Sequence, residues 1–205
     1  MQPTPGGARV CHAQQTRAQS ARACEHGLVS AESDGWGQVL LGERVRVQPI
    51  DSRLAQAMLD GVPDPQLAWE DGFPMTPVLG IARVIAAAAA PLGPFLAYVI
   101  VRRSDGLAVG DAGFHGPPSE AGEVEVGYAL VPAARGAGLV HEAMALLVAW
   151  AWSQPAVRVI TARVDPGNEP SQRVVRRLGF TLDGERDGMS RYVLKPGRSE
   201  PARAS

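Results

Sequence analysis

The feature that most constrains the fold is a strand-like run that ends in a glycine-bearing turn and continues into an apolar-periodic segment. The run covers residues 124–130, the turn holds Gly136 and Gly138, and the periodic segment ends near Trp152. Glycine lets the backbone approach a ligand closely, and the unpaired N–H groups and positive dipole end of the following helix favour an anion. The sequence therefore predicts a phosphate cradle between a strand and a helix.

Composition indicates a globular protein and excludes several partners. The 205 residues are 45% hydrophobic and 20% charged, with a formal net charge of −1. This balance gives no general attraction to nucleic acid or to an anionic membrane, so we expect neither partner. The two cysteines, Cys11 and Cys24, lie outside every segment with a folded pattern, which predicts a cytoplasmic protein without disulfides. The histidines near them are too closely spaced for a closed zinc motif, so no metal is expected.

The chain is expected to hold one domain with two loose ends. Residues 1–38 are rich in Gln, Ala, Arg, Ser and Gly, which predicts a disordered N-terminal extension. Strand-like and helical patterns alternate through residues 39–196, and residues 197–205 form a loose C-terminal tail. Residues 84–101 are almost uninterrupted apolar residues, but two prolines and a glycine in their middle indicate a helix, a turn and a strand rather than a membrane span.

Hydrophobic periodicity predicts an α+β fold, with a mixed, twisted sheet of six to seven strands, a central βαβ crossover and about four helices. The expected strands cover residues 44–50, 95–101, 107–115, 123–131, 156–164, 179–186 and 189–195. The expected helices cover residues 51–59, 76–90, 136–152 and 169–178. Asp51 and Thr76 are predicted N-caps, Gly179 is a predicted helix stop, and Gly110 and Gly113 mark bulges or close approaches.

A proline-rich loop at residues 61–77 carries three large apolar side chains, Trp69, Phe73 and Met75. Such a loop either borders a binding cleft or covers the core beneath a long connection. The sequence leaves both interpretations open.

Two common nucleotide-binding motifs do not match the glycine turn. A Walker loop needs Lys and Ser or Thr after its last glycine, whereas Leu139 and Val140 follow Gly138 here. A dinucleotide fingerprint needs glycine or alanine where this chain has His141, and no acidic residue closes a strand about twenty residues on. His141 either donates a hydrogen bond to a phosphate or points to solvent.

The turn instead resembles the acyl-CoA pyrophosphate loop of the GNAT superfamily of N-acetyltransferases, with the matching residues at 131–142. Downstream, residues 168–180 are similar to the family's Asn-x-x-Ser helix that runs into Leu-Gly-Phe. Upstream, residues 125–130 resemble the preceding strand in the branch that acetylates the N-termini of ribosomal proteins. The resemblance covers about residues 44–195, and its specific motifs lie within 123–180.

The resemblance implies that acetyl-CoA is the co-substrate and lies where the strands at 123–131 and 156–164 splay apart. Backbone groups of Leu130 and Val131 would pair with the pantetheine arm. The residues implied to hold the pyrophosphate are Arg135, Gly136, Ala137, Gly138, Leu139 and Val140. Arg135 either adds a charge-assisted contact to the phosphate or is an ordinary solvated side chain.

Amine attack on a thioester needs a proton acceptor and support for the departing thiolate. Glu125 matches the acidic position thought to act as the base in the ribosomal-protein branch, although a carboxyl with the usual pKa of ~4.3 needs burial or a bridging water. The alternative is an edge-strand glutamate in an ion pair. Many members carry a tyrosine where this chain has Val175, so Ser171 is expected to support the thiolate, unless it only caps its helix. Asn168 and Ser171 match positions that face the cofactor in the family.

The implied function is transfer of an acetyl group from acetyl-CoA to a primary amine, by a monomer or homodimer. At pH 7 an α-amine with a pKa of ~7.7–8.0 is about a tenth neutral, whereas a lysine amine with a pKa of ~10.4 is neutral in fewer than about one molecule in a thousand. One modest base therefore favours an α-amine or another amine of low pKa, bound by the 61–77 loop and the last hairpin. A non-catalytic acyl-CoA sensor and a protein-interaction module on the same fold remain alternatives.

Overall fold

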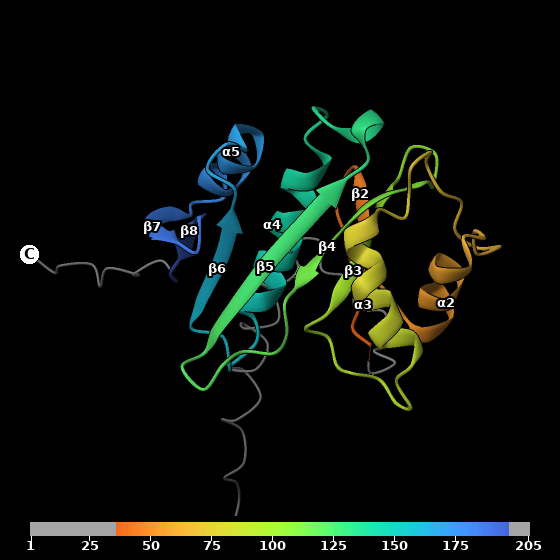
Figure 1. The fold of residues 1–205 in the computed structure, drawn as a ribbon, viewed down its shortest axis with the longest axis horizontal. Coiled ribbons are helices and arrows are strands. Elements are labelled where there is room, and N and C mark those ends of the chain that lie inside the picture. Colours follow the sequence, from red (N-terminus) through yellow and green to blue (C-terminus); the bar gives the residue numbers. More distant parts are fainter. Residues whose placement is uncertain (1–35, 197–205) are drawn as a thin grey trace, which may run out of the picture.

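The computed structural model of the chain describes residues 36–196, which form an eight-stranded mixed sheet with α3 in front of it and α4 behind it (Figure 1). The strand order is β1-β2-β3-β4-β5-β6-β8-β7. The strands are β1 (Leu40–Leu41), β2 (Val45–Pro49), β3 (Ala97–Arg102), β4 (Ala108–Phe114), β5 (Glu123–Leu130), β6 (Val159–Val164), β7 (Thr181–Arg186) and β8 (Met189–Leu194). The helices are α2 (Ser52–Asp60), α3 (Thr76–Ala86), α4 (Leu139–Trp152), α5 (Glu169–Arg177) and the short 3₁₀ turn η2 (Pro132–Ala134).

The predicted α+β fold with a central βαβ crossover is confirmed, since β5 and β6 pair in parallel and α4 connects them. The strand beyond the seven expected is the two-residue β1. The ranges 1–35 and 197–205, with Cys11, Cys24 and most of the predicted N-terminal extension, lie outside the described residues. Among the helices of residues 36–196, none has the length and apolar character needed to cross a membrane.

The predicted start of α4 was three residues too early. Gly136 and Gly138 have φ values of 80° and 74°, in the left-handed region, so residues 136–138 form a turn and the helix begins at Leu139. Similarly, β6 begins at Val159 rather than at residue 156.

The predictions for α3 were wrong at both ends. Its N-cap is Met75 rather than Thr76, and no side chain caps it; the first turn instead holds Pro77, which needs no N–H partner there. The helix ends at Ala86, not at residue 90. Residues 87–90 are mostly exposed alanines, which have helix propensity but no apolar face to bury. The predicted Asp51 cap of α2 is confirmed, because Leu54 N donates to Asp51 Oδ1 at 2.7 Å.

The core lies largely between the sheet and α4. Met144 and Leu147 of this helix are fully buried, as its periodicity predicted. Trp150 adds tilted ring contacts, with its centroid 5.0 Å from Phe95 and 5.4 Å from Phe114. This packing fixes where the N-terminus of α4 lies relative to β5.

The 61–77 loop covers the core. Phe73 is buried, Trp69 packs against the core, and the two rings meet edge to face at 5.7 Å. Trp69 also forms an isolated bridge with Ala108 at the start of β4. Of the two interpretations left open by the sequence, the structure favours the covering role.

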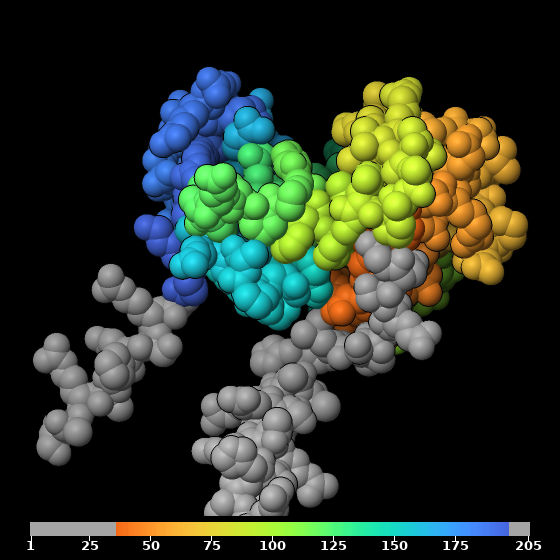
Figure 2. Space-filling model, turned by 90° about the horizontal axis from the view of Figure 1, so that it is seen from below, coloured from red at the N-terminus to blue at the C-terminus, as the bar shows by residue number. Residues whose placement is uncertain are grey.

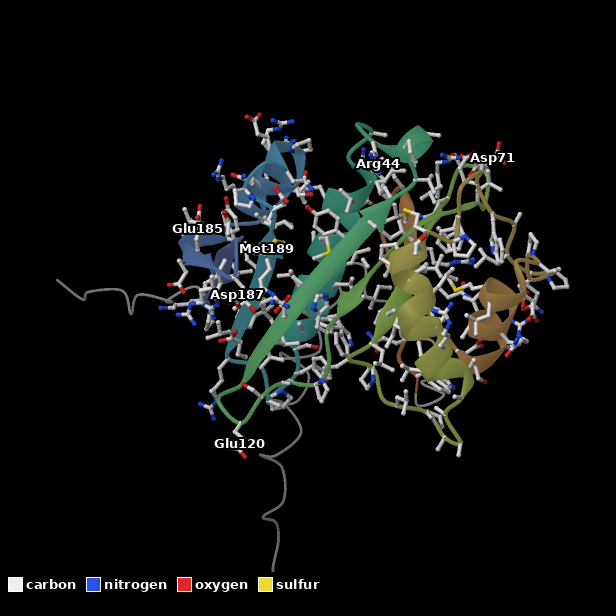
Figure 3. The ribbon with its side chains drawn as sticks, viewed as in Figure 1. Arg44, Asp71, Glu120, Glu185, Asp187 and Met189 are labelled. Atoms are coloured by element: carbon white, nitrogen blue, oxygen red, sulfur yellow. The ribbon has the colours of Figure 1, made fainter. Side chains whose placement is uncertain are left out.

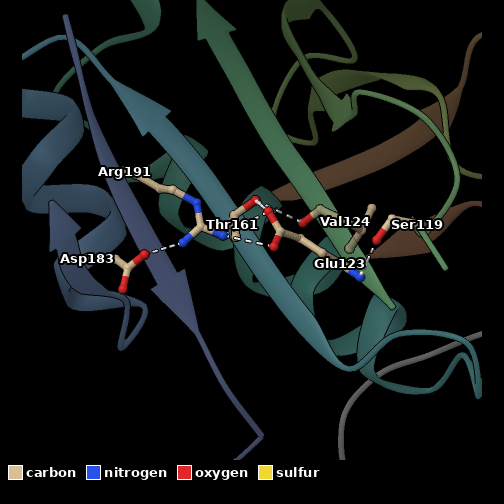
Figure 4. A network of polar contacts seen from close by, with 6 residues as sticks. All are labelled: Ser119, Glu123, Val124, Thr161, Asp183 and Arg191. Carbon is tan, nitrogen blue, oxygen red and sulfur yellow. Dashed lines mark hydrogen bonds and ion pairs between the residues drawn. The ribbon is translucent and has the colours of Figure 1, made fainter. Parts of the chain in front are cut away.

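The strands β5 and β6 splay apart as expected. They pair over only three residues, from Glu123 with Val159 to Glu125 with Thr161, and β5 then continues unpaired on that side to Leu130. The closed end is held by charge, as Figure 4 shows: Arg191 Nη2 donates to both oxygens of Glu123 at 2.9 and 2.8 Å and its other nitrogen reaches Asp183. The open end of the splay faces the start of α4.

Candidate active site

A cavity of about 560 Å³ lies on the sheet between α3 and the start of α5. Strands β4 and β5 contribute the greatest number of residues to its lining, and α3 adds apolar side chains. Figure 2 shows a hollow between the side of the molecule that carries α3 (yellow-green) and the side that carries the C-terminal elements (blue). The 61–77 loop and the last hairpin were expected to form this pocket, but they contribute only Pro77 and Met189, of which Figure 3 labels Met189. The 61–77 loop instead packs its large apolar side chains against the hydrophobic core.

The start of α4 is open for an anion. Its N-cap, Gly138, has no side chain, so no side-chain cap satisfies the first N–H groups. Arg44 donates to the carbonyl oxygens of Ala137 at 2.8 Å and Gly138 at 3.4 Å. Because C=O and N–H point in opposite directions in a trans peptide, the N–H groups of Gly138 and Leu139 point away from Arg44. The predicted cradle therefore has its donors turned outward.

Arg44, which lies beside this turn in Figure 3, was not predicted from the sequence. Its Nε donates to Glu142 Oε2 and its backbone N donates to Glu142 Oε1, both at 2.8 Å. Burial pushes the pKa of Glu142 up, but these hydrogen bonds and the positive charge of Arg44 outweigh it and hold the pKa below its usual value. The Arg44–Glu142 pair thus links the loop before β2 to the first turn of α4.

Leu130 and Val131, the predicted backbone partners of the pantetheine arm, differ in how many of their backbone groups are free to bind it. Val131 N donates to Val109 O and Val131 O accepts from Ala134 N, so most of its backbone capacity is already used. Hydrogen bonds alternate along an antiparallel strand, so Leu130 turns its backbone toward the open splay instead. Its carbonyl oxygen accepts from Arg135 Nε at 3.1 Å, which directs this predicted phosphate ligand back to the strand end.

Glu125 makes an ion pair beside the cavity. Its Oε1 accepts from Arg163 Nε at 2.9 Å and lies 3.0 Å from His115 Nδ1. The ion-paired alternative considered from the sequence is therefore present, but both partners line the cavity. His115 was missed because only the pairing of β4 with β5 places it opposite Glu125, as the bond from His115 N to Glu125 O shows.

Asn168 and Ser171 lie together at the cavity wall. Asn168 caps α5, since Ser171 N donates to its Oδ1 at 3.1 Å, so the Ser171 hydroxyl is not the cap. Tyr128 also reaches this point from β5 and donates to Ser171 O at 3.2 Å. Burial raises the pKa of Tyr128 against a smaller lowering effect of the Ser171 side chain, so its hydroxyl stays protonated at neutral pH. No sequence motif predicts a role for Tyr128, because its place in the splay depends on the position of α5.

The acetyltransferase (GNAT) domain family matches residues 44–181. The chain belongs to the GNAT acetyltransferase family. An uncharacterized N-acetyltransferase of Bacillus subtilis, YjdG, is 38% identical over 89 residues, which cover 43% of this chain and 53% of that protein. The chain spans about half the length of the curated relatives that it matches.

Solved GNAT structures share the fold. Mycobacterium smegmatis RimJ, solved with CoA-disulfide, is 22% identical with a TM-score of 0.56 and covers 78% of this chain and 88% of that chain. Vibrio fischeri ribosomal-protein-S5-alanine acetyltransferase is 18% identical with a TM-score of 0.55, and the match covers 80% of this chain and 99% of that chain. The expected GNAT fold is confirmed, and its neighbours in structure include ribosomal-protein acetyltransferases.

This GNAT chain carries a further carboxylate in the cavity that the sequence analysis missed. Asp111 lies on β4 opposite Ala129 of β5. Its Oδ1 is buried and has no hydrogen-bond partner in residues 36–196, and burial raises its pKa to about 7. One sequence signal could have identified Asp111 as a candidate site residue: it is the single acidic residue in a strand that is otherwise apolar or glycine. Over the same residues, no cluster of three or more His, Cys, Asp or Glu side chains offers a metal site.

Proposed function

We propose that this GNAT chain transfers an acetyl group from acetyl-CoA to a primary amine. The observation that carries the proposal is the continuity of two sites along β5. Tyr128 and Ala129 line the cavity, and Leu130 leads directly into the turn whose N–H groups point outward. A molecule that joins an anionic pyrophosphate to a thioester fits such a pair of sites.

The pyrophosphate would lie on the first turn of α4, held by the backbone N–H groups of residues 136–140, since Arg135 N already donates to Pro132 O at 3.2 Å. The positive dipole end of a 14-residue helix supports this arrangement, as does the absence of a side-chain cap. The pantetheine arm would follow the open side of β5 past Leu130, and the thioester would reach Asn168 and Ser171. Both residues are at the cavity wall.

Acetyl transfer then needs the amine to lose protons and the sulfur to leave as a thiolate. We assign proton acceptance to Glu125 acting with His115, which lines the cavity 3.0 Å from the carboxylate. We assign support of the thiolate to the Ser171 hydroxyl, since Ser171 lines the cavity beside Tyr128. The tyrosine that many relatives use is Val175 here, and this side chain is fully buried.

An α-amine or another amine of low pKa is the proposed acceptor class. One neighbour in structure is named as an acetyltransferase of a ribosomal-protein alanine, which is consistent with an α-amine acceptor. A larger fraction of an α-amine than of a lysine amine is neutral at pH 7, so a single base has fewer ammonium groups to deprotonate. We place the protein in the cytoplasm as a monomer or homodimer.

A thermal-shift measurement followed by a thiol-release assay tests this function. Acetyl-CoA should raise the Tm of the purified chain, and an alanine-initiated peptide should then release free CoA thiol. Nα-acetyl-lysine amide, which presents only an ε-amine, should react at least ten times more slowly at pH 7. A Tm shift without thiol release from any amine would indicate the sensor alternative, and the absence of both would refute acetyl-CoA-dependent transfer.

A further inference from the structure

The floor of the cavity is built from small residues around one carboxylate. Asp111 shares its face of β4 with Gly113, and the residues opposite these two on β5 are Ala129 and Gly127. A Cβ at Gly113 would collide with Leu96 O, and one at Gly127 would lie 2.9 Å from His115 Nε2. The glycines therefore let the Leu96 backbone and the His115 ring lie close against the sheet, and Asp111 is the carboxylate on this face of β4.

Within residues 36–196, Asp111 forms no ion pair with a cationic side chain. From α3, the cavity receives only Pro77, Val78 and Ile81. The other titratable groups at or beside the cavity come from β5, β6 and the residues that directly follow β4 and β6: His115, Glu125, Tyr128, Arg163 and Asp165. The cationic side chain among them, Arg163, is paired with Glu125. A carboxylate oxygen that is buried without a partner is costly to a fold, which favours a role in binding.

We propose that Asp111 is the subsite for the ammonium group of the acceptor and takes the first proton from it. This inference rests on the proposed acetyl transfer and names the group in the cavity that selects the substrate. A cationic primary amine would supply the missing N–H donors to Asp111 Oδ1. The raised pKa of Asp111, about 7, is also close to the value at which a carboxylate can accept a proton near neutral pH.

The proton balance uses two acceptors. The bound ammonium, R–NH3+, gives one proton to the Asp111 carboxylate and becomes R–NH2. The nitrogen lone pair then forms the N–C bond to the thioester carbonyl, the C–S bond breaks, and CoA leaves as the thiolate. The second N–H proton passes to His115, which Glu125 orients. Three protons on nitrogen thus become one on the amide, one on Asp111 and one on His115.

The cavity shape predicts which amines fit. Val78 and Ile81 narrow the approach to the cavity with apolar side chains, which favours a slender amine. A primary ammonium can place a hydrogen on Asp111, whereas a trimethylammonium group of the same charge can neither donate nor lose a proton. The site should therefore distinguish the two cations.

A binding experiment tests the subsite without any turnover. The Tm of the full chain is measured at pH 8 with millimolar glycinamide and with its N,N,N-trimethyl analogue. Glycinamide should raise the Tm of the wild type, and the trimethyl analogue should not. Asp111→Asn, which keeps the side-chain shape, should lose the glycinamide shift, whereas the control Asp60→Asn on the far helix α2 should keep it. Equal shifts for the wild type and Asp111→Asn would overturn the proposal.

A kinetic experiment tests the proton step in the same variants. For the wild type, kcat/KM for the amine should rise with pH through about 7. Asp111→Asn should lose about 100-fold in kcat/KM and lose that rise, while its affinity for acetyl-CoA by calorimetry stays within about twofold. A loss smaller than threefold with the same pH profile would refute the role. If the wild type itself fails to bind acetyl-CoA, the proposed function fails, and the glycinamide shift still decides whether Asp111 binds ammonium.

Discussion

Glu125 Oε1 lies 3.0 Å from His115 Nδ1, across the junction between β5 and the end of β4. Arg163 Nε binds the same oxygen at 2.9 Å, so one carboxylate oxygen orients two side chains that line the cavity. The imidazole is held through Nδ1, which leaves Nε2, the nitrogen beside Gly127, as its second site for a proton. The relationship turns a predicted lone base into a carboxylate–imidazole pair.

Replacing Glu125 should separate chemistry from cofactor binding. We expect Glu125→Gln to lower kcat by about 10- to 100-fold, because the amide no longer supports a protonated His115. Calorimetric affinity for acetyl-CoA should not change. Glu185→Gln is the matched control, since Glu185 lies on β7 away from β5 (Figure 3). A kcat within twofold of the wild type would rule out the assigned role of Glu125.

An added methyl group at Gly136 would meet no neighbouring atom, but it would strain the backbone conformation. Its φ is 80°, and an added Cβ meets nothing within 4 Å. We expect Gly136→Ala to cost about 1 kcal/mol of strain and to weaken acetyl-CoA binding about tenfold as the turn shifts. The control Gly80→Ala lies in the exposed middle of α3, where alanine is the better helix former. Gly80→Ala should raise the Tm slightly. Equal acetyl-CoA affinities for Gly136→Ala and Gly80→Ala would contradict the proposal that the turn at Gly136 binds the pyrophosphate.

The Arg44–Glu142 pair should stabilise the cradle by a measurable coupling. A double-mutant cycle with Arg44→Ala and Glu142→Ala should give a coupling free energy of about 0.5–1 kcal/mol, since Arg44 is half exposed. The pKa of Glu142 is lower in the folded chain than in the unfolded chain, so its stabilisation is present at neutral pH and is lost as pH falls through the carboxyl range. The Tm difference between wild type and Glu142→Ala should therefore shrink below about pH 4. A pH-independent difference would show that packing, not charge, is responsible.

The two hydroxyls at the start of α5 should have different roles. Ser171→Ala should lower thiol release about tenfold without changing acetyl-CoA affinity, because it removes the group proposed to support the thiolate. Tyr128→Phe removes the bond to Ser171 O, so it should lower stability by about 1 kcal/mol and affect kcat less. Measured kcat and Tm values for both variants check this division. The reverse pattern would assign the thiolate to Tyr128.

Asp111 should destabilise the free chain at high pH. Its pKa rises from 3.8 to about 7 on folding, so the folded state binds the proton more tightly and stability falls as pH rises between these values. The full shift corresponds to at most about 4 kcal/mol, less the effect of partial exposure. We expect Asp111→Asn to exceed the wild type in Tm by several degrees at pH 8 and to match it near pH 4. An unchanged difference across this range would show that Asp111 is already neutralised by a partner.

Much of the fold followed from local patterns. The period of β5 and α4, the glycine turn between them and the Asp51 cap each depend on residues close in sequence, and each is present. The errors fell where packing overrides propensity. The alanines at 87–90 favour a helix, but they have no surface to cover, so α3 ends before them.

The sequence alone determined the family-like motifs, the open start of α4 and the place of Glu125, Asn168 and Ser171 on their elements, because these depend on neighbours in the chain. Only the tertiary structure decided what surrounds them. The pairing of β4 with β5 brings His115 to Glu125 and buries Asp111 opposite Ala129, and the position of β2 brings Arg44 to the cradle. These contacts join residues from separate strands or loops, and their burial and charge depend on strand register, which no local pattern specifies.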